Sequence, residues 1–313
     1  MRADSLTGSP EPGAARPPTA ERPPSVPELD SAAPVIGSVH PLPIHQLGVA
    51  TVHRPSAVVT DSVRVGDLHV AGVSMIGLSH LIAGGVRQDA YNFVATTEGL
   101  LVVAIADGLG SRTLSQVGAS FFCTGVMQAA VSGCASAVAL VRSGSGYAAT
   151  AAKSLYQLKA ADISFVAAVA VFQAQTTDDA RGAEIARIGD VSAFALNDGR
   201  LVELFPADDE PVNLVRASLP GEAEPEVVHS TATIIALATD GLAVDLRTSP
   251  GIQKWLGLRW AVPLGPFAFA DTLRYQRQSS HDDRTAVAVW RVSADQVTEV
   301  SMHDQIGETQ NGT

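Results

Sequence analysis

Two apolar segments of this chain run directly into the dipeptide Asp-Gly, and this feature limits most strongly what the chain can fold into. They are Val102–Gly108, with the sequence VVAIADG, and Ile234–Gly241, with the sequence IIALATDG. Short apolar runs rich in β-branched residues predict buried strands. A carboxylate at the end of a buried strand is costly to desolvate unless it is paired or bound to a cation. The sequence therefore predicts two core strands that each lead into a site able to take up a cation.

Acidic residues flank two further predicted strands. The segment Ala186–Asp190 ends in an aspartate, and the pair Asp282–Asp283 stands just before Thr285–Trp290. Carboxylates that converge at strand ends suit Mg²⁺ or Mn²⁺, which prefer oxygen ligands. A single Asp-Gly is more often only a turn, and Asp198–Gly199 is such a case because polar residues flank it. The repetition after apolar strands favours a metal site.

The rest of the pattern is mostly that of β-strands, with fewer helical signals. Strands that do not alternate regularly with helices favour antiparallel sheets flanked by helices over a doubly wound parallel sheet. The predicted strands are Leu100–Ala106, Ile163–Phe172, Ala183–Ile188, Ser192–Leu196, Ala232–Ala238 and Ala286–Trp290, with an edge strand at Ser62–Val70 and a hairpin turn at Asn197–Gly199. The predicted helices are Ser111–Val131, Ala148–Ala160 and Phe267–Arg277.

Charge and composition narrow the function classes. The formal net charge is −11, whereas nucleic acid and anionic membranes attract proteins with surplus Lys and Arg, so we expect no nucleic-acid partner. The uncharged stretch Thr113–Val141 is long enough to span a bilayer. Its polar residues, and ends without Trp or Tyr, indicate instead a buried helix and no membrane insertion. Two cysteines are too few for a disulfide framework and Met1–Gly13 lacks the apolar segment of a secretory signal, so we expect a cytoplasmic protein.

The two ends of the chain differ in composition from its middle. Ten of the eighteen prolines lie within residues 1–43, mixed with Ala, Ser and Glu. Such a segment buries too little apolar surface to fold, so we expect a disordered tail over residues 1–43. We expect one domain over residues 70–292 and a polar C-terminal tail over residues 293–313.

Five motifs along the chain resemble those of the protein phosphatase 2C family (the PPM type of metal-dependent phosphatase), in its bacterial branch and in the family's order. They are Gly77–Ala90, which ends in Gln-Asp-Ala, Ala106–Ser111, Ile188–Ser192, Thr239–Leu242 and Asp282–Thr285. They spread over about residues 70–292. The resemblance implies an α+β fold, a four-layer α-β-β-α sandwich of two antiparallel sheets flanked by helices. It also implies a metal centre at one end of the two sheets.

The resemblance assigns roles to individual residues. Asp107 would bridge two Mn²⁺ or Mg²⁺ ions and Gly108 would offer its carbonyl oxygen. Asp240 and Asp282 would complete the shell of the first metal, so Asp107 and Asp240 are the catalytic candidates. Asp190 is a candidate ligand for a third, weaker metal position. Two cations that share a water lower its pKa and aim hydroxide at phosphorus.

Several positions near the first motif support the ligands or depart from the family pattern. Many members carry an arginine that binds substrate phosphate where this chain has Gly84, and Arg87 and His80 are the candidates to replace it. Many members have Glu where this chain has a neutral Gln, so the second metal is expected to be held largely through water. The supporting residues are Gln88, Asp89 and Asp283.

Three functions remain open on the sequence. The leading one is a phosphoserine/phosphothreonine protein phosphatase that acts on a phosphorylated protein and opposes a Ser/Thr kinase. The second is a pseudophosphatase that binds phosphoprotein without turnover, which the missing arginine at Gly84 favours and the retained aspartates oppose. The third is a phosphatase of a small phosphorylated metabolite. An enclosed basic pocket would favour a metabolite, whereas a shallow acidic site would favour protein substrates.

Overall fold

The computed structural model describes residues 33–37, 55–112, 114–174, 182–205, 224–278 and 280–292, all within one compact unit. Two antiparallel sheets dominate it, a five-stranded sheet in the order β10-β7-β6-β5-β4 and a six-stranded sheet in the order β2-β3-β13-β11-β8-β9. A third, two-stranded sheet pairs β1 with β12 in parallel.

The bounds of the elements are as follows. The strands are β1 (Val35–Ile36), β2 (Val58–Val65), β3 (Leu68–Met75), β4 (Ala90–Ala95), β5 (Leu100–Gly108), β6 (Phe165–Gln173), β7 (Ala183–Ile188), β8 (Ser192–Asn197), β9 (Arg200–Glu203), β10 (Glu226–Ser230), β11 (Ile234–Ala238), β12 (Gln276–Arg277) and β13 (Arg284–Arg291). The helices are α1 (Leu78–Ala83), α2 (Ser115–Val131), α3 (Ala137–Tyr156), the 3-10 helix η1 (Ala160–Ile163), α4 (Asp240–Thr248), α5 (Pro250–Arg259) and α6 (Pro266–Thr272).

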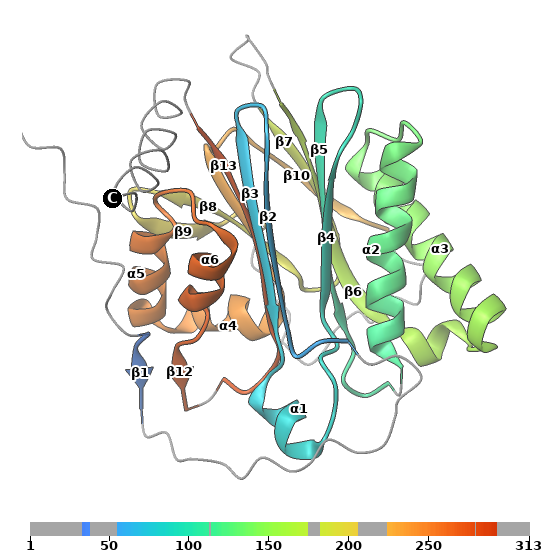
Figure 1. Cartoon of the computed structure of the whole chain (residues 1–313), viewed down its shortest axis with the longest axis horizontal. Helices are drawn as coiled ribbons and strands as arrows, with labels where there is room; N and C mark the ends of the chain where they lie inside the picture. The colour runs from blue at the N-terminus through green and yellow to red at the C-terminus, as the bar shows by residue number, and fades with distance from the viewer. Residues whose placement is uncertain are drawn as a thin grey trace, which may run out of the picture. The chain divides into compact units, whose positions relative to one another are not determined.

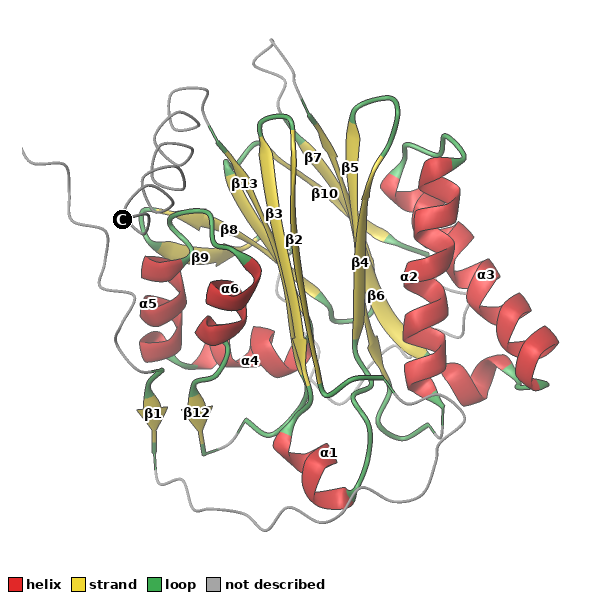
Figure 2. Cartoon of the chain, in the orientation of Figure 1, coloured by secondary structure: helices red, strands yellow, loops and turns green. Residues whose placement is uncertain are grey.

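The elements stack in four layers. Helices α2 and α3 cover the outer face of the five-stranded sheet, and α4, α5 and α6 cover the outer face of the six-stranded sheet (Figures 1 and 2). Three clusters of buried apolar side chains fill the interfaces between these layers, one on each outer face and one between the sheets. The predicted α-β-β-α sandwich is confirmed.

Strand β5 shows how the sequence divides its side chains between two layers. Val102, Ala104 and Ala106 pack against the α2–α3 side, whereas the odd-numbered residues Leu101, Val103 and Ile105 pack between the sheets. Side chains alternate across a strand. Asp107 is the next odd-numbered residue, so this alternation directs its carboxylate towards the space between the two sheets. The apolar pattern of the strand therefore sets where its terminal acid points.

The predicted strands are confirmed as β5, β6, β7, β8, β11 and β13, with small shifts of their ends. Three other predictions are wrong in detail. The predicted edge strand Ser62–Val70 spans a hairpin, because Gly66–Asp67 form the turn between β2 and β3. Helix α3 begins at Ala137, well before the predicted start, and α6 ends at Thr272, after which the chain enters β12.

Two expectations about the ends and the membrane can be compared with the structure. Residues 33–37 lie inside the predicted disordered tail, yet they include β1, so that prediction is wrong for this short segment. The rest of residues 1–43, and the predicted tail at residues 293–313, lie outside the described residues. Among the helices that the structure describes, α2 and α3 included, none has the length and apolar character needed to cross a bilayer.

Candidate metal centre

The acidic residues singled out in the sequence gather at one end of the sandwich. Asp107 lies at the end of β5 in the five-stranded sheet, and Asp240 begins α4 directly after β11 in the six-stranded sheet. Asp282 stands just before β13, and Asp190 lies in the turn that carries the chain from β7 to β8, from one sheet to the other. Because neighbouring strands run antiparallel, the end of one strand lies beside the start of the next. These positions therefore all lie at the same end of the sandwich, which is the lower end in Figure 1.

Asp107 and Asp240 form the link between the two sheets at this end. Their carboxyl groups are hydrogen-bonded to each other. Burial, followed by the charge of Asp89 and then that of Asp240, raises the pKa of Asp107 well above its usual range. Burial also raises the pKa of Asp240. Two buried carboxyl groups in contact cannot both ionise cheaply, so a proton or a cation must lie between them.

Asp89 supports this pair from the start of β4. Its Oδ2 accepts hydrogen bonds from the Thr239 and Thr285 hydroxyls at 2.8 and 2.7 Å. Burial, and then the charge of Asp283, raises the pKa of Asp89 to about 8. Thr239 precedes Asp240, and Thr285 follows the Asp282–Asp283 pair, so one carboxyl group binds both segments that carry candidate ligands.

Asp283 fastens the same end of the sheet to the first motif. One of its oxygens accepts the Gly77 backbone N–H at 2.6 Å and the His80 Nδ1 at 2.8 Å, and the other accepts the Gln88 N–H at 2.6 Å. Potential ligand atoms of His80, Asp282 and Asp283 lie within 4.8 Å of one another. Both oxygens of Asp283 are engaged by N–H donors, a geometry that suits a supporting role beside the candidate ligands. The hydrogen bond to Asp283 raises the pKa of His80.

Asp282 is exposed, and its Oδ1 accepts the Asp283 backbone N–H at 2.9 Å. A Cβ atom at Gly77 would overlap the Asp282 main chain, and one at Gly241 would overlap the Asp283 carbonyl oxygen. Only glycine permits such an approach of two backbones. Gly241, which follows Asp240, therefore has a steric role, because without a side chain it lets the start of α4 pack closely against the Asp282–Asp283 loop.

Arg87, which the sequence suggested as a phosphate contact, has a structural role. It is buried, with 6% of its surface exposed. Its Nη1 donates to the Ser74 hydroxyl at 2.5 Å and to the Asp89 carbonyl at 2.6 Å, and its Nε donates to the Ser56 carbonyl at 2.9 Å. This placement corrects the phosphate-contact interpretation. Arg87 instead supplies a buried positive charge next to the acidic cluster.

Asp190 has a basic neighbour that the sequence analysis did not single out. Arg247 on α4 binds Glu203 through Nε and Nη2, at 2.9 and 2.6 Å, and also contacts the Ser192 hydroxyl. Ser192 in turn bonds to the Asp190 carbonyl oxygen at 3.3 Å. The charge of Asp190 contributes to the raised pKa of Asp240, so Asp190 acts electrostatically on the candidate metal centre. Arg247 therefore ties the Asp190 turn to α4.

The donor set fits a hard divalent cation. Asp107, Asp240, Asp282 and Asp190 offer carboxylate oxygens, and the buried Gly108 follows Asp107 at the end of β5 and offers its carbonyl as a further candidate donor. These candidate ligand atoms are oxygens, which suit Mg²⁺ or Mn²⁺ better than a soft metal. The raised pKa values of Asp107 and Asp240 also favour a bound cation, because its positive charge would reduce the repulsion between the two carboxylates. The residues present therefore fit the metal that the sequence analysis expects.

The hydroxyl groups that connect the motifs were not predicted from the sequence. Ser74, Thr239 and Thr285 form a continuous hydrogen-bonded chain, with the Ser74 and Thr285 oxygens 2.5 Å apart and the Thr285 N–H donating to Thr239 at 3.1 Å. The sequence does contain a signal for them, because Thr239 and Thr285 lie within two residues of a motif aspartate and Ser74 lies on β3, which pairs with β13. Their function depends on which strands pair, and a single sequence does not give that pairing.

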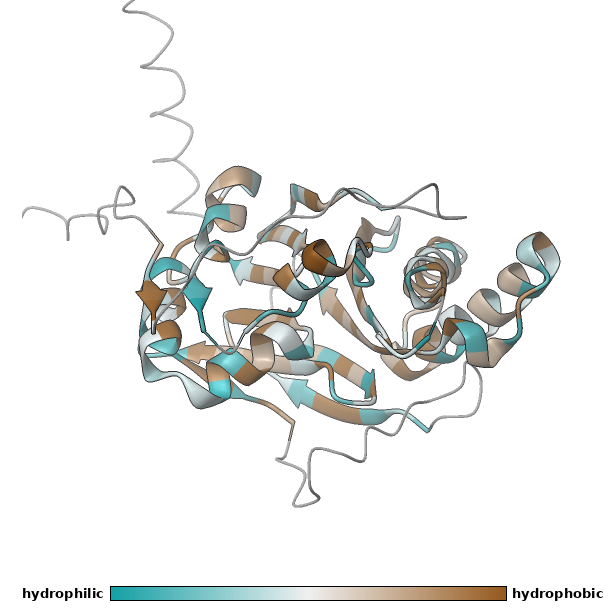
Figure 3. Cartoon of the chain, turned by 90° about the horizontal axis from the view of Figure 1, so that it is seen from below, coloured by the Kyte–Doolittle hydropathy of each residue, from teal (hydrophilic) through white to brown (hydrophobic). Residues whose placement is uncertain are grey.

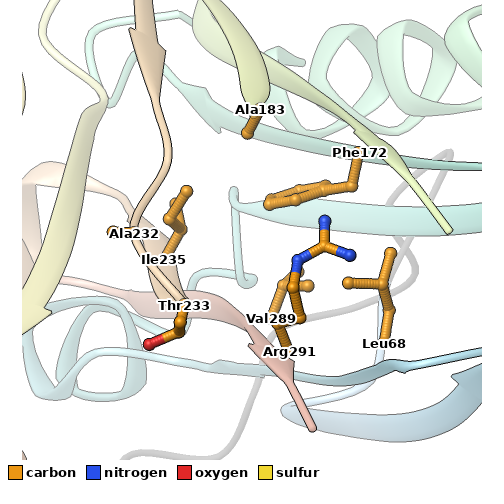
Figure 4. Close-up of a pocket in the computed structure, with 8 residues that line it drawn as sticks. All are labelled: Leu68, Phe172, Ala183, Ala232, Thr233, Ile235, Val289 and Arg291. Atoms are coloured by element: carbon orange, nitrogen blue, oxygen red, sulfur yellow. The ribbon is translucent and has the colours of Figure 1, made fainter. Parts of the chain in front are cut away.

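A small hollow also opens at the opposite end of the layer between the sheets (Figure 4). Apolar residues such as Leu68, Phe172 and Val289 line it, and Arg291 closes it by donating to Asp67 at 2.6 Å and to the Gln173 carbonyl at 3.1 Å. Its eight lining residues include no acid and no cysteine or histidine. Chemistry is therefore expected at the acidic end.

The raised pKa values predict how the stability of the metal-free protein depends on pH. The pKa of Asp89 is about 8, and those of Asp107 and Asp240 are raised as well, against about 3.9 in an unfolded chain. The folded state therefore keeps protons that the unfolded state releases. The resulting stabilisation is complete below about pH 4 and is lost as the pH rises towards 8.

Chelator-treated protein is accordingly expected to lose thermal stability between about pH 5 and about pH 8, and Asp89→Asn is expected to flatten that slope. Asparagine keeps an acceptor for both threonine hydroxyls. Thermal melts at several pH values measure the slopes, and Asp198→Asn in the β8–β9 turn is the matched control. Equal slopes in the wild type and Asp89→Asn would show that these groups do not titrate as described.

Comparisons with known proteins agree with this architecture. Residues 76–273 match the model of the family Protein phosphatase 2C. A bacterial serine phosphatase structure superposes with a TM-score of 0.51 and 14% identity, over 71% of this chain and 97% of that one. The catalytic domain of the serine/threonine phosphatase PstP, solved with two manganese ions, gives 0.49 and 18% identity, over 72% and 99%.

RsbX solved with magnesium gives a TM-score of 0.49 and 15% identity, over 74% of this chain and 99% of that one. No curated protein sequence matches the chain significantly. The family match covers more than half of the 313 residues and all but the last of the five motifs. The chain belongs to the protein phosphatase 2C family.

Proposed function

We propose that the chain is a metal-dependent phosphoserine/phosphothreonine protein phosphatase that uses water activated by two cations. The observation that carries this proposal is the hydrogen bond between Asp107 of one sheet and Asp240 of the other, with the charge of Asp282 acting on both carboxyl groups. Family membership supports the reaction class. Bound Mn²⁺ or Mg²⁺ would supply a water of lowered pKa and would neutralise charge that develops on the phosphoryl group.

The chain's own residues would position these cations. Asp107, whose carboxylate points between the sheets, would contact both, and Asp240 and Asp282 would hold the first. The Gly108 carbonyl would contribute to the second position, and Asp190 would offer a third, weaker one. Gln88 is a neutral amide where a carboxylate would bind more strongly, so we expect the second cation to bind more weakly than the first.

A phosphate group also needs a positively charged contact, and we propose Arg112 for it. Arg87 is buried, and Arg247 is paired with Glu203. Arg112 is exposed on the loop that follows Asp107–Gly108, and no ion pair or side-chain hydrogen bond engages it within the described part of the chain. A guanidinium matches a phosphate geometrically through paired N–H donors. His80 remains a second candidate for this contact.

Arg112→Ala is expected to raise KM for a phosphothreonine peptide about tenfold while kcat changes by less than about threefold. The reason is that a phosphate contact made in both the ground and transition states contributes to binding more than to turnover. Steady-state kinetics provide the measurement. Arg200→Ala is the control, because Arg200 is also exposed but lies at the other end of β8 from the Asp190 turn. An unchanged KM for Arg112→Ala would contradict the assignment.

The function itself is tested by phosphate release from phosphoserine and phosphothreonine peptides and from small phosphorylated metabolites. The assay is run with Mn²⁺, with Mg²⁺ and with a chelator. Metal-dependent turnover that prefers the peptides supports the proposal, and a preference for a metabolite contradicts the substrate class. Absence of turnover in folded, metal-loaded protein contradicts the enzyme. That last result would favour a phosphoprotein-binding pseudophosphatase, for which Gly84 and the buried Arg87 are the supporting observations.

The proposed activity places the chain in a defined kind of reaction cycle. Its substrate would be a phosphorylated protein made by a Ser/Thr kinase, and the phosphatase would oppose that kinase. The two free cysteines fit a reducing compartment such as the cytoplasm.

A further inference from the structure

A short segment that precedes the sandwich in sequence pairs with β12, the strand that leads into the Asp282 loop. Val35 and Ile36 form β1 and pair in parallel with Gln276 and Arg277 of β12 (Figure 1). The Gln276 N–H donates to the Pro34 carbonyl at 2.9 Å, and the Gln278 N–H donates to the Ile36 carbonyl at 3.2 Å. In the view from below, the apolar β1 lies next to the polar β12 (Figure 3).

The two side chains of β1 face different surroundings. Val35 is exposed, at 61%, whereas Ile36 is half-buried and packs against the apolar cluster beneath α4, α5 and α6. The Ile36 Cδ1 reaches the start of α5, where a Cβ atom at Gly251 would lie 3.3 Å from it. Backbone pairing and one anchored side chain hold β1 against β12, with which it forms a separate two-stranded sheet.

The strand that receives this segment continues directly into the metal-binding loop. Arg277 donates to Asp245 at 2.5 Å and to Thr248 at 2.9 Å, so β12 is tied to α4. Ser280 also donates to Asp245 at 2.5 Å. Asp282 follows two residues later. The register of β12 therefore fixes one side of the loop that presents the Asp282 carboxylate.

We propose that β12 and the start of α5 form a peptide-binding groove whose ligand is Ala33–Gly37 of the same chain, and that docking of this segment holds the Asp282 loop in its cation-binding geometry. Two backbone hydrogen bonds and one anchor side chain make a weak contact by themselves. The covalent link through residues 38–54 raises the effective concentration of the segment, on the order of millimolar for short tethers. The docking does not depend on catalysis, whereas its effect on cation binding rests on the proposed function.

Docking is tested by hydrogen exchange at the Gln276 and Gln278 amides in full-length protein. Ile36→Ser is expected to increase exchange at both by about tenfold or more, because it removes the anchor and exposes the amides to water. Val35→Ser is the matched control, since this neighbouring side chain points to solvent, and it should leave exchange unchanged. Gly251→Leu fills the groove from the other side and should act like Ile36→Ser. Unchanged exchange in both Ile36→Ser and Gly251→Leu would overturn the proposal.

The consequence for the metal is measured by calorimetric titration of Mn²⁺ in the same variants. Ile36→Ser is expected to weaken Mn²⁺ binding about threefold to tenfold, whereas Val35→Ser should not. Faster amide exchange with unchanged Mn²⁺ affinity would overturn the positioning role. If wild-type protein binds no Mn²⁺ while Ile36→Ser still speeds exchange, the proposed function fails and the groove stands. Amide protection that falls on dilution of the wild type would show docking between two copies and would overturn docking within one chain.

Discussion

Asp240→Asn is expected to reduce Mn²⁺-dependent kcat at least about 100-fold to 1000-fold. Asp240 contacts Asp107 across the two sheets, and an amide in its place both weakens cation binding and introduces an N–H donor towards the site. Removing a buried acid whose pKa is raised should at the same time increase the melting temperature of the metal-free protein near neutral pH. Lost activity with retained or increased stability separates a catalytic role from unfolding.

The matched control for this substitution is Asp198→Asn. Asp198 also precedes a glycine, but it lies in the exposed β8–β9 turn with a left-handed backbone that asparagine tolerates equally well. It should keep full activity. Steady-state assays and thermal melts in chelator measure both properties. Near-wild-type activity in Asp240→Asn would contradict the assignment of this carboxylate to the metal centre.

Asp245→Ala is expected to lower the free energy of unfolding by about 3–5 kcal/mol, the range found when one partner of a buried ion pair is removed. Asp245 on α4 is buried and accepts hydrogen bonds from Arg277 at 2.5 Å, Tyr275 at 2.7 Å and Ser280 at 2.5 Å. Arg284 lies 3.8 Å away. Alanine would leave two partly buried guanidinium groups and two hydroxyl groups without this acceptor, beside the loop that carries Asp282.

Asp271→Ala is the control for Asp245→Ala. Asp271 also lies on a helix and pairs with an arginine, Arg274, at 2.7 Å, but both side chains are half exposed or more. An exposed ion pair contributes less than about 1 kcal/mol, so this change should be small. Urea denaturation of the two variants in chelator provides the comparison. Equal effects would show that the Asp245 network adds little to stability.

The sequence located the acidic end of the molecule because its signals are local. Each aspartate follows or precedes an apolar strand, and the period of two along β5 directs Asp107 between the sheets. Roles that depend on tertiary pairing were not visible in the same way. Arg87 reads as a surface charge or phosphate contact until β3 and β4 enclose it, and Asp245 reads as an ordinary helical acid until Tyr275 and Arg277 fold back onto it.

Element boundaries failed for comparable physical reasons. Helix α3 carries small residues along much of its length, from Ala137 onward, so its first half gives little helical periodicity. Strand β12 consists of two polar residues, and only its partner β1 makes it a strand. Neither a two-residue strand nor its distant partner leaves a pattern that periodicity can detect.

Calorimetric titration of Mn²⁺ into wild-type protein and Asp107→Asn tests the central claim most directly, that carboxylates from the two sheets together bind divalent cations. We expect the wild type to bind Mn²⁺ with a strong and a weaker phase, and Asp107→Asn to lose both, because Asp107 would contact each cation. Asp198→Asn should bind as the wild type does. Equal Mn²⁺ binding by the wild type and Asp107→Asn, with both proteins folded, would contradict this account.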